Sequence, residues 1–286
     1  MTKLTFLEAT NAQHQEELVA LDRKLFNFYN SEKASCYWSD ADNSNFTWTP
    51  ETHPYHLHLK SLVKSGSKVV ELGCGSAHAY RNLRDLGIDY TGIEWSESQA
   101  RLNAETFPDA KFISGSFYKV PLPDSSFDVA ISLFTLEHTV YPHTYLQEMI
   151  RLVKPNGIIA ILCPDFRGAG GMNSFVYGTS SLELREKLKM GRLWDTLLHL
   201  YEREFAFPQK IRKEYSNQNK DKKFLIYSNP KCIEGKCYSD TDAIYFVGQP
   251  EIQTFLEESN CQILKQRSHL MNSESGFCYM IAKKST

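Results

Sequence analysis

The sequence predicts an α/β protein built on a doubly wound, mostly parallel sheet of seven strands whose last strand is antiparallel. Three observations predict this fold. Short apolar runs of strand length alternate with helical segments between residues 67 and 166. A glycine-rich turn at 71–76 follows the first of these runs. Near the C-terminus, two strand-like runs stand too close together for a parallel crossover, so we expect them to pair antiparallel.

The strands and helices of the core follow from the period of the apolar residues. The predicted strands are 68–72, 90–94, 111–114, 127–133, 158–163, 261–269 and 276–284. The predicted helices are 79–86, 96–107, 143–153 and 250–258. Gly87 closes the first helix, and Ser96 caps the second with Gln99 at capping-box spacing. Strands that alternate with helices imply a parallel sheet with helices on its faces.

The N-terminal segment has helical periodicity. An amphipathic helix is predicted over 11–30, where apolar residues recur near helical spacing: Leu18, Leu21, Leu25, Phe26 and Phe28. The polar, aromatic-bearing segment that follows it is interpreted as a loop. A second helix is predicted over 55–64, ending at Ser65 and Gly66.

Composition and charge restrict the class of protein. Apolar residues at 42%, aromatic residues at 13% and charged residues at 23% indicate a globular protein. The net charge of -2 disfavours general nucleic-acid binding, although a local basic patch stays open. We expect no membrane partner, because no run approaches the roughly 20 apolar residues of a membrane helix and the start lacks a secretion signal. Seven scattered cysteines fit a reducing compartment, so we expect a cytoplasmic protein.

Two clusters of metal-ligand residue types do not predict a metal. Cys232 and Cys237 are more widely spaced than the tight pair of most zinc sites, and no second pair follows them. On a helix, His58 would point away from His53 and His56. We therefore interpret these histidines as solvated or packed, and predict no metal site.

The glycine-rich turn and one carboxylate together predict a nucleoside site. Gly73 and Gly75 let the backbone turn tightly and approach a ligand closely. A nicotinamide-binding fingerprint would need a third small residue where His78 stands. Glu94 closes the second strand, 94 − 75 = 19 residues after the second glycine, where it can accept hydrogen bonds from both hydroxyls of an adenosine ribose.

Five motifs in order resemble the class I S-adenosylmethionine-dependent methyltransferases, in particular the small-molecule branch that includes quinone-biosynthesis enzymes. The motifs are E-L-G-C-G-S at 71–76, G-I-E-W-S at 92–96, L-P-D-S-S-F-D at 122–128, L-F-T-L-E-H at 133–138 and R-L-V-K-P-N-G at 151–157. The resemblance covers residues 68–163, and the terminal hairpin agrees with the reversed last strand of that family. It implies S-adenosylmethionine as the cofactor.

The resemblance also implies a role for residues on the methionine and ribose side of the cofactor. Glu71, Gly73 and Gly75 would hold the methionine moiety, and Glu94 the ribose. Leu133, at the end of the fourth strand, would touch the methionine. The alternative for Glu71 is that it only caps a neighbouring backbone.

The implied adenine contacts follow the second and third strands. Trp95 would cover one face of the adenine, or be part of the core. Ser116 stands where the family more often has an acidic residue that contacts the adenine amino group. Phe117 would contribute its backbone N–H and pack near the base, although an apolar residue needs no ligand to be buried. We interpret Cys74, in the same region, as a packed side chain without a chemical role.

His138 is the candidate catalytic residue. Methyl transfer from a sulfonium is an in-line displacement with an activated donor, so positioning can supply much of the acceleration. A base is needed only where the acceptor loses a proton, and His138, just beyond the fourth strand, titrates in the right range. The alternative is a structural role for this histidine.

The predicted organisation has four parts: an N-terminal helical segment and cap at 1–66, a cofactor-binding Rossmann-like core at 67–166, an insertion at 167–242, and a final helix and hairpin at 243–286. We expect the insertion to be a lid that shapes the acceptor site. Its apolar residues would line an acceptor pocket or form a plain helical core: Phe175, Tyr177, Leu193, Trp194, Leu197 and Tyr201.

Three functions are compatible with these features. The first is methylation of a nitrogen, oxygen or carbon on a small-molecule acceptor. The second is a binding or regulatory protein that keeps the cofactor fold without turnover. The third is an RNA or protein methyltransferase, because the basic stretch at 208–224 lies among Phe207, Tyr215 and Phe224, and such a mixture can bind single-stranded nucleic acid. A charge run is more often a solvated loop, and the sequence carries no signal of oligomeric state.

Overall fold

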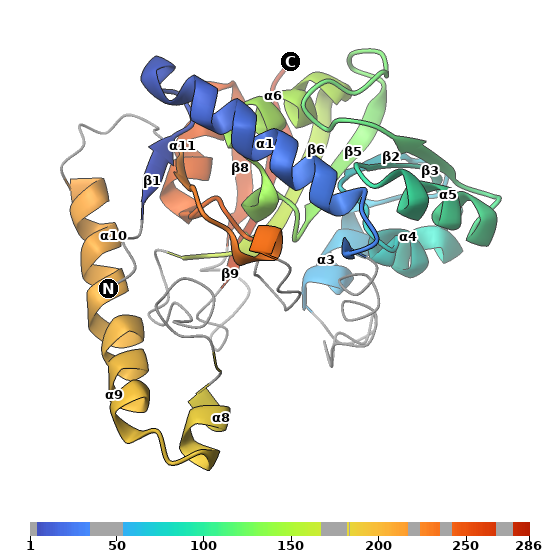
Figure 1. Ribbon diagram of the computed structural model, residues 1–286. Coiled ribbons are helices and arrows are strands. Elements are labelled where there is room, and N and C mark those ends of the chain that lie inside the picture. Colours follow the sequence, from blue (N-terminus) through green and yellow to red (C-terminus); the bar gives the residue numbers. More distant parts are fainter. Residues whose placement is uncertain are drawn as a thin grey trace.

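The computed structural model describes residues 5–34, 54–166, 182, 184–216, 224–234, 242–266 and 277–286. Its centre is a seven-stranded sheet (Figure 1). In spatial order the strands are β4 (Lys111–Ser114), β3 (Asp89–Glu94), β2 (Lys68–Leu72), β5 (Phe127–Leu133), β6 (Val153–Pro164), β9 (Phe277–Lys284) and β8 (Cys261–Gln266). The predicted number of strands is confirmed.

The direction of the strands also follows the prediction. The strands from β4 to β6 are parallel to their neighbours, and β9 runs antiparallel between β6 and β8. The predicted antiparallel pairing of the last two strands is therefore confirmed, while the linker at 267–276 lies outside the described residues. β6 begins at Val153, earlier than the predicted residue 158, because Phe127 already pairs with Val153 before a shift in register.

Helices cover both faces of this sheet. The α-helices are α1 (Gln15–Tyr29), α3 (Pro54–Leu62), α4 (His78–Leu83), α5 (Glu97–Thr106), α6 (Pro142–Leu152), α8 (Leu184–Lys189), α9 (Leu193–Tyr201), α10 (Phe207–Ser216) and α11 (Gln249–Glu258). Shorter turns are η1 (Ala12–His14), η2 (Arg84–Leu86), η3 (Leu136–His138), the π-helical η4 (Glu202–Ala206) and η5 (Lys231–Glu234). The predicted helix at 79–86 is thus α4 followed by the 3₁₀ turn η2, which ends at Gly87 with φ of 68°.

Alternate residues of each strand belong to two different hydrophobic clusters, as period-two patterning requires. Val70, Leu72 and Ile93 pack with α1, α6 and α11. Val69 and Tyr90 pack with α3 and α4 on the opposite face. Figure 1 shows α1 crossing in front of the sheet. Because the strands from β4 to β6 are parallel, their carboxyl ends lie at one edge of the sheet.

The N-terminus takes part in a small second sheet that the sequence did not predict. β1 (Phe6–Glu8) pairs antiparallel with β7 (Leu225–Tyr227), which comes more than 200 residues later in the chain. Three-residue strands carry too little periodicity to be recognised from sequence. Phe26 also departs from the prediction, since it is 44% exposed and lies beside the Trp95 ring instead of in the core.

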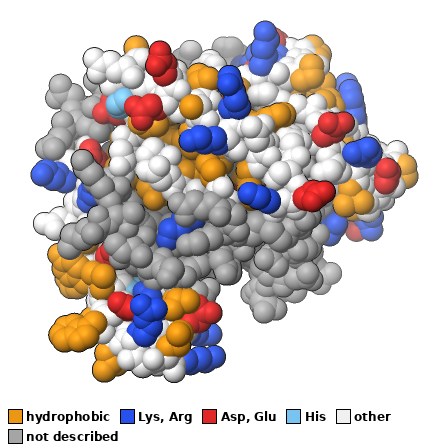
Figure 2. Space-filling model, viewed as in Figure 1, with side chains coloured by type: hydrophobic (Ala, Val, Ile, Leu, Met, Phe, Trp, Pro, Cys, Tyr) orange, Lys and Arg blue, Asp and Glu red, His pale blue; other side chains and the backbone are white. Residues whose placement is uncertain are grey.

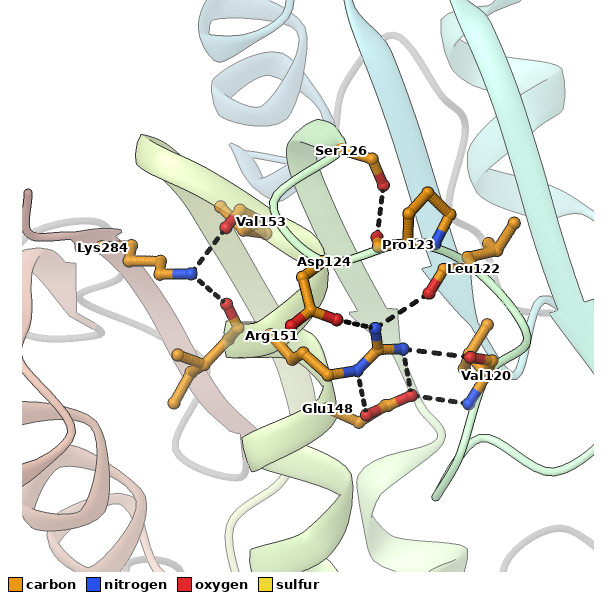
Figure 3. Close-up of polar contacts among 10 residues, drawn as sticks. Val120, Leu122, Pro123, Asp124, Ser126, Glu148, Arg151, Val153 and Lys284 are labelled. Carbon is orange, nitrogen blue, oxygen red and sulfur yellow. Dashed lines mark hydrogen bonds and ion pairs between the residues drawn. The ribbon is translucent and has the colours of Figure 1, made fainter.

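Two of the motifs that carried the family resemblance have a structural role. Arg151 on α6 donates to the backbone oxygens of Leu122 and Val120, and pairs with Asp124 and Glu148 (Figure 3). The Glu148 carboxylate in turn accepts the Val120 N–H. This network joins the loop before β5 to the end of α6, at the amino end of β5. These contacts fix the fold at the opposite end of β5 from His138.

Candidate functional site

The turn after β2 has the backbone conformation that the two glycines predict. Gly73 and Gly75 have φ angles of 73° and 49°, in the left-handed region that disfavours other residues. A Cβ on Gly73 would lie 2.1 Å from Thr135 Cγ2. The Thr135 hydroxyl donates to Gly73 O at 2.9 Å, so this threonine, which the sequence analysis missed, supports the turn.

Glu94 lies beside this turn at the end of β3. Its carboxylate accepts the backbone N–H of Gly75 and that of Ser96, each at 2.9 Å. Burial raises the pKa of Glu94, and these backbone hydrogen bonds oppose the rise. An ionised carboxylate has about four lone-pair sites, so acceptor capacity remains for ribose hydroxyls.

The same two contacts order the segments on either side of Glu94. Ser96 caps α5 through its hydroxyl, which accepts the Gln99 N–H at 3.4 Å. The Gln99 side chain bonds Asn103 and does not complete a capping box, because Glu94 already takes the Ser96 N–H. Asn103 donates to Gly75 O at 2.7 Å, which makes it a second support of the turn that the sequence analysis missed.

Glu71 is a buried carboxyl at the end of β2. It is 1% exposed and accepts a hydrogen bond from the Tyr90 hydroxyl. Burial raises its pKa to about 8, the bond from Tyr90 opposes the rise, and the charge of Glu94 adds to it. Glu71 is therefore mostly protonated at neutral pH, and a cation placed beside it would favour its ionised form.

The residues predicted for the adenine side form an aromatic cluster. Trp95 is 6% exposed, and its ring centroid lies 5.0 Å from that of Phe117 and 6.1 Å from that of Tyr29. Phe117 is buried as well. The Ser116 hydroxyl accepts the Tyr118 N–H at 3.1 Å. This packing agrees with the alternative in which Trp95 and Phe117 belong to the core.

On the other side of the turn, β5 ends at the half-buried Leu133 and leads through η3 to His138. His138 Nδ1 lies 3.3 Å from Asp242 Oδ2, and Nε2 lies 3.7 Å from Glu137 Oε1. The Tyr29 hydroxyl donates to the same Asp242 oxygen. A buried histidine thus lies between two buried carboxylates. The sequence analysis missed Asp242, since it follows a segment without periodicity.

Helix α1 closes one side of this site through polar contacts with several loops. Asn30 donates to Trp95 O at 3.2 Å and accepts the Glu97 N–H at 3.0 Å, so it caps the start of α5. Burial raises the pKa of Asp22 to about 6, and a hydrogen bond with Tyr118 opposes the rise. Tyr118 also accepts the Val140 N–H at 2.9 Å. The N-terminal helix is therefore part of the site.

The remaining candidates of the sequence analysis have packing contacts. His56 and His58 contact Asn82 and Tyr279 respectively, whereas His53 and Cys237 lie outside the described residues. Burial raises the pKa of the Cys74 thiol well above its ordinary value. The described part of the chain holds no group of three or more metal-ligand side chains suited to an ion. Within it, each helix is too short or too polar to span a bilayer.

Comparison with known proteins gives the site its context. Residues 70–161 match the family described as "Methyltransferase domain". A demethylmenaquinone methyltransferase of Paenarthrobacter aurescens is 33% identical over 99 residues, which cover 35% of this chain and 39% of that protein. A 2-methyl-6-phytyl-1,4-hydroquinone methyltransferase of Synechocystis sp. is 36% identical over 100 residues, covering 34% and 31%. The chain thus matches about two fifths or less of the length of these relatives.

A solved structure with a similar fold is the PH0226 protein from Pyrococcus horikoshii, with a TM-score of 0.54 at 14% identity, covering 89% of this chain and 99% of the other. A "SAM dependent methyltransferase" from Aquifex aeolicus gives a TM-score of 0.50 at 14% identity, covering 86% and 97%. The fold and the buried carboxylate beside the glycine turn are those expected of a nucleoside-binding α/β domain. Residues 70–161 thus match a methyltransferase domain, and the relatives over this stretch are methyltransferases, which agrees with the resemblance to the class I S-adenosylmethionine-dependent methyltransferases seen in the sequence.

Proposed function

We propose that the whole protein transfers the methyl group of S-adenosylmethionine to a small-molecule acceptor. The observation that carries this proposal is the Glu94 carboxylate, held by the N–H groups of Gly75 and Ser96 next to the turn at Gly73. A fixed, buried acceptor beside a tight glycine turn fits the ribose of a nucleoside. When bound, the cofactor supplies an activated methyl group on a sulfonium.

The protein's own residues would contribute binding and orientation. Glu94 would accept the ribose hydroxyls, and the backbone at Gly73 and Gly75 would lie against the methionine part. Glu71, ionised by the nearby positive charge, would pair with the methionine end. Leu133 would contact the methionine, while Trp95, Ser116 and Phe117 would form the base side. These groups hold the donor in place and exclude water, which is what an in-line displacement requires.

His138 would take a proton only from an acceptor that must lose one. Asp242 lies 3.3 Å from its Nδ1, so the carboxylate can orient the ring and favour the protonated form after transfer. The contact is buried, which strengthens it relative to a surface pair. For an acceptor that is already nucleophilic, the same pair would serve only to hold η3 in place.

The acceptor would be a small, apolar or aromatic molecule. Relatives act on demethylmenaquinone and on a phytyl hydroquinone, and a sterol 24-C-methyltransferase of Gibberella zeae is 26% identical over 168 residues, covering 54% of this chain and 44% of that protein. Phe207 and Phe224, which would have stacked on bases in an RNA-binding stretch, are both buried. We therefore favour a small molecule over RNA. The scattered cysteines favour the cytoplasm.

The test is methyl transfer to a panel of quinols, sterols and small amines, followed by mass spectrometry with a trideuteromethyl-labelled cofactor. We expect an acceptor that gains one labelled methyl group together with stoichiometric S-adenosylhomocysteine. A folded protein that binds the cofactor but methylates no member of the panel and no metabolite of a cell extract would support the regulatory alternative. Labelled RNA or protein from the same extract would support the macromolecular one.

The insertion at 167–242 is proposed as a lid over the acceptor. We expect Gly168, Gly170 and Gly171, at the start of the insertion, to act as its hinge. These glycines, like Phe175 and Tyr177, lie outside the described residues. Hydrogen exchange across the insertion tests this proposal, with slower exchange expected when cofactor and acceptor are both present. Slow exchange without ligand that the two ligands leave unaltered would contradict it.

A further inference from the structure

The most unusual surface of the molecule lies on the segment 184–216, which contains α8, α9, η4 and α10 and is called the arm below. Figure 1 shows the arm extending away from the sheet. Its base is anchored: Phe207 and Ile211 of α10 pack with Tyr227 and Phe246. The far part of the arm, α8 and α9, contacts mainly its own neighbouring turns.

In this far part of the arm, several polar side chains are buried and many apolar side chains are exposed. Lys187, Thr196 and His199 are buried, and Lys187 Nζ lies 3.1 Å from His199 Nδ1. The apolar residues face outward: Trp194 is 84% exposed and Leu193 67%. The other exposed apolar side chains on α9 and η4 are Leu197, Leu198, Tyr201 and Phe205. Figure 2 shows hydrophobic side chains gathered on this part of the surface. Four of these residues were expected to line a pocket or to form a helical core, and their exposure shows that the helical-core alternative is wrong.

An outward apolar face is unfavourable in water and gains free energy when an apolar medium or partner covers it, so a large one marks an interaction site. Single exposed apolar residues occur on any protein, but these recur at helical spacing on one side of α9, at 193, 194, 197, 198 and 201. The face combines Trp and Tyr with Leu, a composition typical of the membrane and water interface.

The charge of the arm favours an anionic partner. Residues 184–216 hold eight Lys and Arg against five Asp and Glu, which gives +3 in a chain whose net charge is -2. The rest of the protein therefore carries -5. Arg185 and Lys189 are exposed on α8, which contacts α9, as is Glu186 between them, whereas Arg192 is paired with Asp195. A second copy of the chain would bring two positive arms together, while an anionic lipid surface attracts the arm and repels the acidic body.

We propose that the arm docks on an anionic lipid bilayer, with Leu193, Trp194, Leu197 and Tyr201 in the interfacial layer and Arg185 and Lys189 against the headgroups. Such binding needs an amphipathic helix and basic residues, and no helix that spans the membrane. It departs from the expectation of no membrane partner, which rested on the lack of a spanning run and of a secretion signal in the sequence. The inference does not depend on the identity of the acceptor.

The test is co-sedimentation of the full-length protein with vesicles of phosphatidylcholine alone or with one third phosphatidylglycerol. We expect binding to the anionic vesicles that weakens as salt rises, and little binding to the neutral ones. The double variant Trp194→Ser, Leu197→Ser should reduce the partition coefficient by at least about tenfold. Lys189→Gln and Arg185→Gln should each reduce it about fivefold at low salt. Leu102→Ser on α5, where the side chain is 54% exposed, is the matched control and should bind like the wild type.

Three outcomes would overturn the proposal. One is equal partition of the wild type and the Trp194→Ser, Leu197→Ser variant into anionic vesicles. Another is that the wild type does not bind the vesicles and forms a dimer, seen by light scattering, that this variant abolishes, which would assign the face to a second copy. The third is that the wild type stays a monomer and binds neither kind of vesicle. Melting temperatures of all variants establish that they are folded, so a loss of binding is due to the substitution and not to unfolding.

Discussion

The cofactor-binding core and the arm differ in how their polar and apolar side chains are distributed between interior and surface. In the core, the buried carboxylates Glu71 and Glu94 have hydrogen-bond donors within the chain: Tyr90 for the first, Gly75 and Ser96 for the second. In the arm, Lys187, Thr196 and His199 are buried, and the apolar side chains of α9 face outward. These two buried carboxylates are therefore satisfied within the fold. The arm has a surface that only a large apolar neighbour would cover.

The largest effect is expected from adding one methyl group at matched glycines of these two regions. Gly73 and Gly191 have φ angles of 73° and 68°. A Cβ on Gly73 would collide with Thr135, whereas a Cβ on Gly191 would meet nothing within 4 Å. Gly191→Ala should cost about 1–2 kcal/mol, the strain of the left-handed conformation alone. Gly73→Ala should cost more than about 3 kcal/mol or prevent folding, because overpacking adds to that strain.

Denaturant unfolding of the two alanine variants at the same pH measures this difference. The double variant Gly73→Ala, Thr135→Ser removes the nearest methyl group and should recover part of the loss. Equal destabilisation by Gly73→Ala and Gly191→Ala would contradict the close packing of the turn against η3 and with it the geometry of the site.

The second prediction uses the pH dependence of the core. The pKa of Glu71 is about 8 in the folded protein against 4.5 as its ordinary value, because the carboxyl is buried. Between these values the folded state keeps a proton that the unfolded state has released, so stability falls as pH rises from about 4.5 to 8. Glu71→Gln keeps an acceptor for Tyr90 without this charge. The variant should match the wild type at pH 4.5 and be more stable at pH 8.5, by on the order of a few kcal/mol.

Unfolding curves of both proteins at several pH values test the prediction. Arg185→Gln on the arm is the comparison variant, because an exposed charge should change stability little at any pH. Parallel pH profiles for Glu71→Gln and the wild type would show that Glu71 is ionised in the folded protein.

The third prediction concerns the chemical step and has the smallest expected effect. His138→Ala should lower the rate of methyl transfer less than about tenfold for an amine or thiolate acceptor, because a base adds about 10²–10⁴-fold only where a proton must leave. The same result is expected for each side chain from Glu137 to Tyr141. The measurement is the single-turnover rate from pH 5 to 9, with Asp242→Asn as the partner variant.

A loss of a thousandfold or more, together with loss of an inflection near histidine's ordinary value of about 6.5, would make His138 the catalytic base. In that case Asp242→Asn should move the same inflection. A merely structural Asp242 would change the melting temperature and leave the pH profile where it was.

The sequence predicted the core well because its signals are local. Strands such as Lys68–Leu72 and Phe127–Leu133 were located to the residue, since each is an apolar run bounded by turn residues. Gly73, Gly75 and Glu94 came from spacing along the chain, and the structure brings them together. Thr135, Asn103 and Asp242 were missed because their partners lie 28 residues or more away in the sequence. The β1 and β7 pair was missed because strands of three residues carry too little periodicity, and the two strands lie more than 200 residues apart.

The prediction for the arm was less accurate than that for the core. Its helical period was visible, and the natural expectation was that an apolar face packs inward or against a ligand. The period determines which residues share a face, but not which face is buried. Thr196 and His199 are on the buried side, where Lys187 of α8 lies 3.1 Å from His199, a contact between two helices that the period does not encode.

The most direct test of the account is the affinity for S-adenosylmethionine, measured by calorimetry on the wild type, Glu94→Gln and Glu97→Gln. Glu97 is exposed and lies three residues further along, so its variant removes the same charge outside the site. Glu94→Gln should weaken binding by more than about tenfold, because it removes charge-assisted hydrogen bonds worth about 1.5–3 kcal/mol each, and Glu97→Gln should bind like the wild type. A folded Glu94→Gln protein with wild-type affinity would contradict the assignment of this carboxylate to the cofactor.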